Sequence, residues 1–154
     1  MQANNHCDCC HKKPAPPTCS HDHGCEPYTL NLRCSTVENN CFRKSIWTGK
    51  CLQCTQMCIP AGQDIGLEIH PKTDQFLYIE CGQGCMMMGN CREHLEYQVE
   101  VCEDCGIFIP AGTWHNLINT GCQPIKLFSI YAPPEHQRCT LQRTKADVPT
   151  KEKC

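Results

Sequence analysis

Cysteine is the residue that most constrains this chain, because it occupies 18 of the 154 positions. In a short chain such a density is typical of secreted domains that are held together by disulfides. Residues 1–28, however, are polar and rich in Cys, His and Pro, with no apolar stretch that an export signal needs. A reducing cytoplasm keeps thiols open, so two explanations remain. Either the cysteines bind metal, or the chain is made in a reducing compartment and cross-linked later, in an assembly outside the living cytoplasm.

Length and charge narrow the class of protein. A chain of this length can bury a hydrophobic core without disulfides, and we expect one domain. The formal net charge of −2 and the pI of about 6.4 give no electrostatic reason to expect nucleic acid or an anionic membrane surface as a partner. No segment approaches the roughly 20 apolar residues of a membrane-spanning helix. We therefore expect a soluble protein with neither nucleic acid nor membrane as a partner.

Composition divides the chain into three regions. Residues 1–27 hold too few apolar side chains to fold alone and are predicted to form a flexible Cys-, His- and Pro-rich arm. Residues 28–134 are the predicted folded domain, and residues 135–154 a polar tail. Short β-rich segments between Pro- and Gly-containing turns predict an all-β sandwich or barrel, with one short helix around Thr36–Phe42. The expected strands are Leu52–Ile59, Ile65–His70, Phe76–Glu80, Cys85–Met88, Leu95–Val101, Ile107–Ile109, Trp114–Ile118 and Ile125–Tyr131.

Four polar residues of the predicted domain are candidates for a metal site. Glu68 and His70 are two positions apart on an expected strand, so both side chains point to the same face. A turn then reverses the chain, and Gln75 begins the next strand, while His115 lies on a much later one. Two imidazoles, one carboxylate and one amide oxygen that converge inside a barrel suit Zn, Mn or Fe(II).

The spacing of these residues resembles the two motifs of the cupin superfamily. The first motif reads Gly, five residues, His-x-His, three or four residues, Glu, six residues, Gly, and it stands here as Gly62, Glu68-Ile69-His70, Gln75 and Gly82. The second motif ends in Pro-x-Gly, two residues, His, three residues, Asn, and it stands here as Pro110, Gly112, His115 and Asn119. Asp104 takes the place of the Gly with which that motif begins. The resemblance covers roughly residues 40–134. It implies a small double-sheet jelly-roll barrel, the cupin double-stranded β-helix, with the metal inside.

Two positions depart from the commonest cupin ligand set, because Glu68 replaces the first His and Gln75 replaces the Glu. The resulting content is similar to the zinc site of cupin-type mannose-phosphate isomerases, with the Glu and Gln positions exchanged. It also contains the two-His-one-carboxylate set of non-haem Fe(II) oxygenases. The resemblance therefore implies a divalent metal whose identity, Zn, Mn or Fe, stays open. The alternative is an inert barrel in which Glu68 and His70 form a hydrogen-bonded pair, since cupins also serve as plain scaffolds.

Strand alternation predicts where the cysteines of the domain point. In 95–102 the apolar residues share one face, which places Cys102 on the outward face. The same argument places Cys54 and Cys58 outward. Thiols on outward faces add little to a fold that has its own core, but they are well placed to meet another molecule. We expect inter-chain disulfide partners in the arm, in this outward set and in the tail, namely Cys7, Cys9, Cys10, Cys19, Cys25, Cys54, Cys58, Cys102, Cys139 and Cys154.

Two Cys-x-x-Cys pairs, Cys51/Cys54 and Cys102/Cys105, each match half of a zinc ribbon. Their separation is far from the usual spacing, and a strand would send positions i and i+3 to opposite faces, so a structural zinc site in the domain is disfavoured. The Cys/His arm at residues 6–25 is the alternative place for a storage metal.

Together these observations favour a cysteine-rich structural protein on a cupin scaffold, which assembles with itself, or with other Cys-rich coat proteins, through disulfides. Synthesis in the cytoplasm without an export signal suits a bacterial spore coat or exosporium, because such layers become extracellular when the mother cell lyses. The alternative is a small metal-dependent cupin enzyme, either isomerase-like or dioxygenase-like. The many thiols favour the structural hypothesis, since they would be a liability to an enzyme that handles oxygen.

Overall fold

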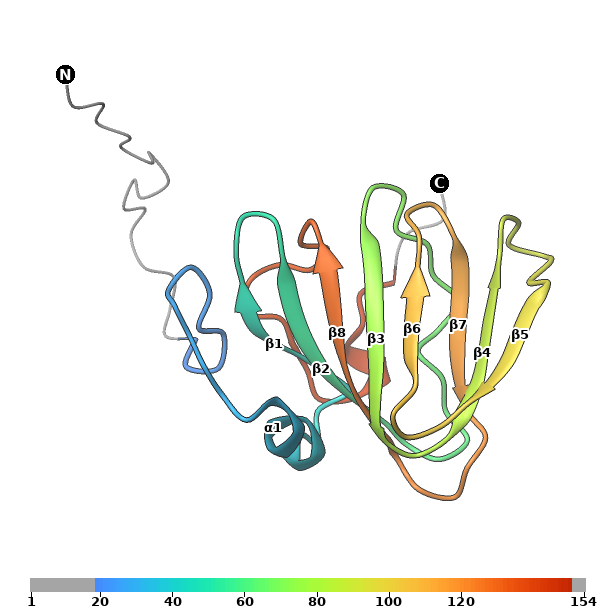
Figure 1. Cartoon of the computed structure of the whole chain (residues 1–154), viewed down its shortest axis with the longest axis horizontal. Coiled ribbons are helices and arrows are strands. Elements are labelled where there is room, and N and C mark those ends of the chain that lie inside the picture. The colour runs from blue at the N-terminus through green and yellow to red at the C-terminus, as the bar shows by residue number, and fades with distance from the viewer. Residues whose placement is uncertain (1–18, 151–154) are drawn as a thin grey trace.

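The computed structural model describes residues 19–150 and consists mainly of antiparallel strands (Figure 1). A short helix, α1 (Leu32–Glu38), comes before the strands, and a single 3-10 turn, η1 (Lys145–Asp147), follows them. The strands are β1 (Arg43–Thr48), β2 (Gln53–Ile59), β3 (Asp74–Cys81), β4 (Gly84–Gly89), β5 (Tyr97–Val101), β6 (Gly106–Ile109), β7 (Trp114–Asn119), β8 (Ile125–Ala132) and β9 (Leu141–Gln142).

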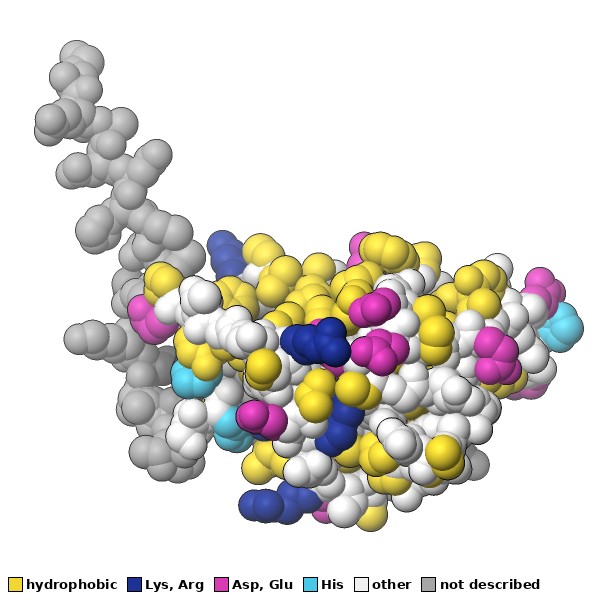
Figure 2. All heavy atoms as spheres, turned by 60° about the horizontal axis from the view of Figure 1, so that its bottom comes forward, with side chains coloured by type: hydrophobic (Ala, Val, Ile, Leu, Met, Phe, Trp, Pro, Cys, Tyr) yellow, Lys and Arg dark blue, Asp and Glu magenta, His cyan; other side chains and the backbone are white. Residues whose placement is uncertain are grey.

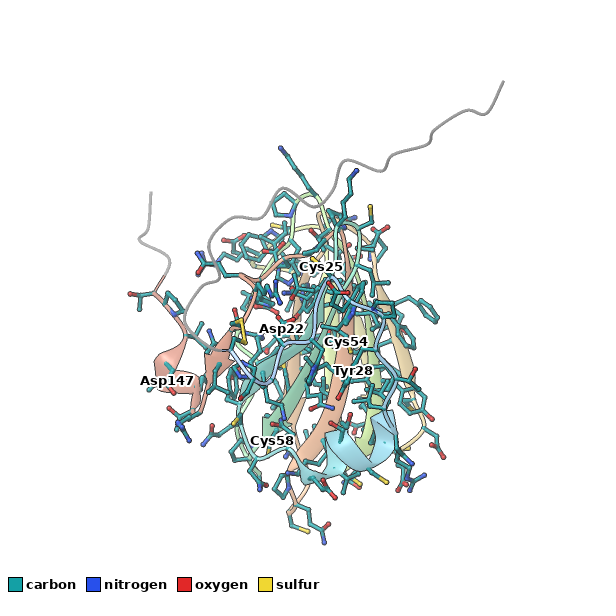
Figure 3. The ribbon with its side chains drawn as sticks, turned by 90° about the vertical axis from the view of Figure 1, so that its left-hand side faces the viewer. Asp22, Cys25, Tyr28, Cys54, Cys58 and Asp147 are labelled. Atoms are coloured by element: carbon teal, nitrogen blue, oxygen red, sulfur yellow. A yellow bond between two sulfur atoms is a disulfide. The ribbon has the colours of Figure 1, made fainter. Side chains whose placement is uncertain are left out.

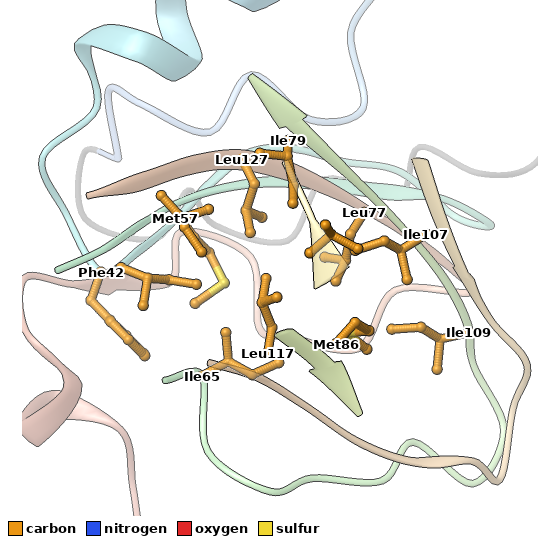
Figure 4. Close-up of a cluster of buried hydrophobic side chains, with 13 residues drawn as sticks. Phe42, Met57, Ile65, Leu77, Ile79, Met86, Ile107, Ile109, Leu117 and Leu127 are labelled. Atoms are coloured by element: carbon orange, nitrogen blue, oxygen red, sulfur yellow. The ribbon is translucent and has the colours of Figure 1, made fainter. Parts of the chain in front are cut away.

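The strands form two sheets that share one core. The larger sheet has the order β6-β3-β8-β2-β1-β9, and the smaller has the order β5-β4-β7. Met86 of β4 and Leu117 of β7 pack against Met57, Leu77 and other side chains of the larger sheet (Figure 4). The predicted all-β jelly-roll barrel is therefore confirmed.

Charged side chains of both signs are scattered among apolar ones over the face shown in Figure 2, in keeping with the small net charge. Within residues 19–150 the helices are too short and too polar to cross a bilayer.

The barrel interior changes from apolar to polar along the strands. Four inward-facing rows of β2 and β8 follow one another from the apolar to the polar end: Ile59 opposite Ile125, Met57 opposite Leu127, Thr55 opposite Ser129, and Gln53 opposite Tyr131. Gln75 of β3 lies on the other side of Tyr131. The apolar rows supply the burial free energy of the fold. The buried polar groups of the other end need partners, so this end is where a functional site is to be sought.

The structure differs from the predicted elements in three places. Residues 65–70 were expected to be a strand, but they run irregularly beside β7, with isolated bridges to it at Glu68 and at the preceding Asp64. The helix begins earlier than expected because the Asn31 side chain caps it by accepting a hydrogen bond from the Cys34 N–H at 2.9 Å. Strand β1 was missed because its inward positions include Arg43 and Ser45, which break the apolar alternation.

Residues 19–27 and 135–150 were predicted to belong to a flexible arm and a polar tail, but they pack against β1 (Figure 3). A disulfide joins Cys19 to Cys139, with the Cα atoms 5.8 Å apart. Asp22 is only 3 % exposed and accepts hydrogen bonds from the Thr48 hydroxyl at 2.7 Å and the Cys139 N–H at 3.0 Å. Strand β9 pairs with β1. A disulfide and polar contacts, together with Val148 against the core, hold these segments, and composition does not reveal such contacts.

The cysteines that were expected to form inter-chain disulfides differ in their bonding and burial. Cys19 and Cys139 bind each other within the chain. Cys54 and Cys58 were expected to be exposed, which is wrong, since their exposed fractions are 7 % and 8 %. The alternation of β2 is as predicted, but the segment around Tyr28 lies over Cys54 (Figure 3). Strand alternation predicts the face on which a side chain lies, but it does not predict which other segment covers that face. Cys25 and Cys102 are exposed and free, as expected. The other candidates, Cys7, Cys9, Cys10 and Cys154, lie outside the described residues.

The burial of Cys54 predicts low thiol reactivity. Burial raises the pKa of the Cys54 thiol to about 12, so the reactive thiolate is scarce at neutral pH. We expect Cys54 to resist alkylation in the native protein at pH 8, while the exposed Cys51 of the same hairpin reacts readily. Mass spectrometry of alkylated peptides measures both sites, and urea should make them equal. Equal rates in the native state would show that the N-terminal segment does not cover β2.

Candidate metal centre

The site is built on a backbone bridge between Glu68 and His115. The N–H of Glu68 donates to the carbonyl of His115 at 3.0 Å, and the N–H of His115 donates to the carbonyl of Glu68 at 2.9 Å. The N–H of Gly112 donates to the carbonyl of His70 at 2.9 Å, so the turn before β7 holds His70 as well. The irregular segment 65–70 and strand β7 thus fix the relative positions of three functional side chains.

The side chains of Glu68, His70 and His115 converge as predicted. Glu68 Oε1 lies 3.4 Å from His70 Nε2 and 3.5 Å from His115 Nε2. Ligand atoms of the three residues all lie within 4.8 Å of one another. A tetrahedral ion with bonds of about 2.1 Å would hold its ligands about 3.4 Å apart. The side-chain separations therefore suit a single transition-metal ion.

Within residues 19–150 the same three atoms make no hydrogen bond. Glu68 Oε1, His70 Nε2 and His115 Nε2 are buried and have no hydrogen-bond partner. An unsatisfied buried polar atom costs about 1 to 3 kcal/mol, so native proteins contain few of them. A bound cation would accept the lone pairs of all three. The buried Glu68, His70 and His115 cluster is thus typical of a cupin metal site, and its donor set fits a divalent ion.

The Nδ1 atoms of both imidazoles lie close to polar groups of the protein. Nδ1 of His115 lies 2.8 Å from the carbonyl oxygen of Thr113, which assigns the proton to Nδ1 and leaves the Nε2 lone pair directed at the site. Nδ1 of His70 lies at an ion-pair distance of 3.0 Å from Glu135 Oε1, without the geometry of a hydrogen bond. A hydrogen bond such as that of His115 orients a metal-binding histidine and raises its basicity.

The charge of Glu68 is set by its neighbours. Burial raises the pKa of Glu68, but contacts with the His115 and His70 imidazoles and the positive charge of Arg43 outweigh burial and hold the pKa well below its usual range. Arg43 Nη2 lies 3.8 Å from Glu68 Oε1, and Arg43 Nη1 donates to Gln142 Oε1 at 3.1 Å. Glu68 is therefore a carboxylate at neutral pH, the state that binds a metal.

Gln75, the predicted fourth ligand, lies at the polar end of the same interior. Its amide nitrogen donates to Ser129 Oγ at 3.0 Å and to the Tyr131 hydroxyl at 3.1 Å. Its Oε1 is buried without a hydrogen-bond partner. These bonds fix the amide with its oxygen free, as a ligand requires, and Gln75 remains a predicted ligand.

Sequence reasoning missed the supporting residues Arg43, Glu135 and Tyr131. They lie outside the motif that carries the ligands, and Glu135 falls in a segment predicted to be a tail. One signal in the sequence could have indicated Glu135. It follows β8 after only Pro133 and Pro134, and loop residues that a rigid sheet positions often line a site.

Comparisons with known proteins agree with this geometry. A family model described as a cupin domain matches residues 55–131. The chain is 53 % identical over 127 residues to the uncharacterized protein YrkC of Bacillus subtilis (strain 168), covering 82 % of this chain and 68 % of that protein. It is 36 % identical over 111 residues to an uncharacterized protein of Acanthamoeba polyphaga mimivirus, covering 71 % of this chain and 67 % of that protein.

A solved structure is similar over most of the chain as well. The crystal structure of BH2720 from Bacillus halodurans has a TM-score of 0.82 and 52 % sequence identity, and the match covers 83 % of this chain and 97 % of that one. Both the motif resemblance and the predicted fold are thereby confirmed, and this chain belongs to the cupin family.

Proposed function

We propose that this protein is a small metal-dependent cupin enzyme whose Glu68, His70 and His115 hold one divalent ion with coordination positions open to a small ligand. The observation that supports this most is the convergence of three buried, unpartnered ligand atoms on one point. Structural zinc sites are closed by four protein ligands, whereas catalytic sites use three and keep a position free. Two His and one carboxylate form the set that non-haem iron enzymes use.

The two acidic residues near the site are partly exposed, with 18 % of the Glu68 side chain and 24 % of the Glu135 side chain accessible, while His70 and His115 are buried. The ligand atom Glu68 Oε1 is itself buried, so solvent reaches other atoms of that side chain. If Gln75 is a fourth ligand, an iron or manganese ion in octahedral coordination still keeps positions free. The bound metal would supply Lewis-acid or redox chemistry, and Glu135 would hold the His70 ring in place.

A second function has support from the surface thiols. Within residues 19–150 the exposed free cysteines include Cys25, Cys34, Cys51, Cys91 and Cys122. They are spread over the N-terminal segment, α1 and several turns, so one molecule can meet several neighbours. An assembly in which each chain is linked to several neighbours is strengthened by multivalency, even where each single contact is weak. We propose that the chain also associates with itself or with other Cys-rich proteins through disulfides, in a surface layer such as a spore coat.

The metal proposal predicts which side chains control metal uptake. His70→Ala and His115→Ala should each abolish stoichiometric binding, because either change leaves only two strong ligands. Gln75→Ala should weaken binding less, since a neutral amide is a poor donor. His94→Ala is the matched control, because His94 is exposed and contacts Glu96. Elemental analysis after dialysis measures the metal content. Equal metal in the wild type and in His115→Ala would place the ion elsewhere, most simply in the Cys/His arm.

Visible absorption spectroscopy tests whether the bound metal has open coordination positions. We expect the wild-type protein loaded with Co²⁺ to change its visible absorption when azide is added, because an anion can enter a free position. His115→Ala should show neither the cobalt spectrum nor the azide response. A cobalt spectrum that depends on His115 but ignores azide would indicate a closed structural site and would contradict the enzyme proposal.

The association proposal predicts a redox-dependent oligomer. Oxidised protein should run as a ladder on a non-reducing gel and collapse to a single band with reductant. Replacing Cys34, Cys51, Cys91 and Cys122 together by Ser should shorten the ladder, whereas Cys58→Ser should leave it unchanged because that thiol is buried. A wild-type chain that stays monomeric under oxidising conditions, with these thiols free by labelling, would rule out the association.

A further inference from the structure

The Cys102-x-x-Cys105 pair lies in a tight turn between β5 and β6 and not on a strand. The Cys105 N–H donates to the carbonyl of Cys102 at 3.1 Å, which closes the turn, and Asp104 adopts a left-handed φ of 66°. The Cys102 N–H donates to Sγ of Cys105 at 3.4 Å. The argument that i and i+3 positions point to opposite faces of a strand therefore does not apply to this pair.

Backbone bonds to β3 hold the turn in place. The Asp104 N–H donates to the carbonyl of Ile79 at 2.9 Å, and the Ile79 N–H donates to the carbonyl of Cys105 at 3.1 Å. The end residues of a four-residue turn have Cα atoms within about 7 Å. A disulfide needs Cα atoms roughly 4.4 to 6.8 Å apart. The two cysteines can therefore be bridged with little movement of the backbone.

The two thiols differ in accessibility. Cys102 is exposed and opens onto a surface depression of about 330 Å³ that Gln83 and Cys122 also line. Cys105 is half-buried and packs against the core. The Cys105 thiol is the largest cause that raises the pKa of Cys102, so the Cys102 thiolate becomes abundant only at alkaline pH. The exposed sulfur can meet a reagent, while Sγ of Cys105 is held in the same turn by the Cys102 N–H.

We propose that Cys102 and Cys105 form a redox-active dithiol that small-molecule disulfides oxidise. The Cys102 thiolate attacks one sulfur of the disulfide, and the first leaving thiolate takes up a proton. The Cys105 sulfur, after losing its proton, attacks Cys102 Sγ and expels the second thiolate, which is protonated in turn. Two protein thiols lose two electrons and two protons, and the small disulfide becomes two thiols. The site is separate from the metal centre, and Cys102 is used within the chain.

Oxidised glutathione under anaerobic conditions provides the test with the whole protein. After the remaining thiols are alkylated, a protease that cuts after Glu103 separates the two cysteines unless a disulfide joins them. We expect linked peptides that contain Cys102 and Cys105 in the wild type. In Cys105→Ser the link should be lost and Cys102 should retain a glutathione adduct. In Cys122→Ser the link should be unchanged.

Cys102→Ser provides a second test that should not disturb folding, because position 102 is exposed. In this variant Cys105 should acquire no adduct, since it is half-buried and loses its accessible partner. The proposal is overturned if Cys102 links to Cys122 or to another chain, or if Cys105→Ser carries no adduct at position 102. It is equally overturned if Cys105 reacts as fast in Cys102→Ser as Cys102 does in the wild type.

Discussion

The two reciprocal backbone hydrogen bonds between Glu68 and His115 are the contact on which the metal centre depends. The segment before them also follows β7, since the Ile65 N–H donates to the carbonyl of Leu117 at 3.1 Å. Each such bond contributes only about 1 kcal/mol. Their effect is geometric, because they bring a carboxylate and an imidazole from distant parts of the sequence to within 3.5 Å. Side-chain attraction alone would not place a buried carboxylate there, because desolvation opposes it.

The division of the interior explains why the fold tolerates this site. Apolar rows such as Ile59 with Ile125 and Met57 with Leu127 supply the core at one end. At the other end, Tyr131 and Ser129 accept hydrogen bonds from Gln75, so that the polar side chains around the ligands are held by one another. Hydrogen bonds between buried side chains restrict their motion, and a metal with fixed bond lengths requires ligands that are held in place. The apolar end of the interior thus stabilises the fold, which allows the other end to hold buried polar side chains.

The sequence was sufficient to predict the barrel and the convergence of Glu68, His70 and His115, because spacing within a motif is local information. Asp104 illustrates this: it stands where the motif has Gly, and its φ of 66° is the left-handed conformation that Gly favours and Asp tolerates. What failed was information about distant packing. Alternation placed Cys54 on an outer face but could not show that residues near Tyr28 cover it. Glu135 approaches His70 from a segment that composition marks as a tail.

The described structure also separates the two explanations for the high cysteine content. Within residues 19–150, Glu68, His70 and His115 are the one group of three His, Cys, Asp or Glu residues whose ligand atoms gather closely enough to share an ion. A closed zinc site needs four such ligands, so this part of the chain forms none from its cysteines. Among the described residues, the candidate metal site therefore lies in the barrel interior. The exposed thiols, including Cys102 of the β5–β6 turn, lie at the surface, where a reagent or a neighbouring chain can reach them.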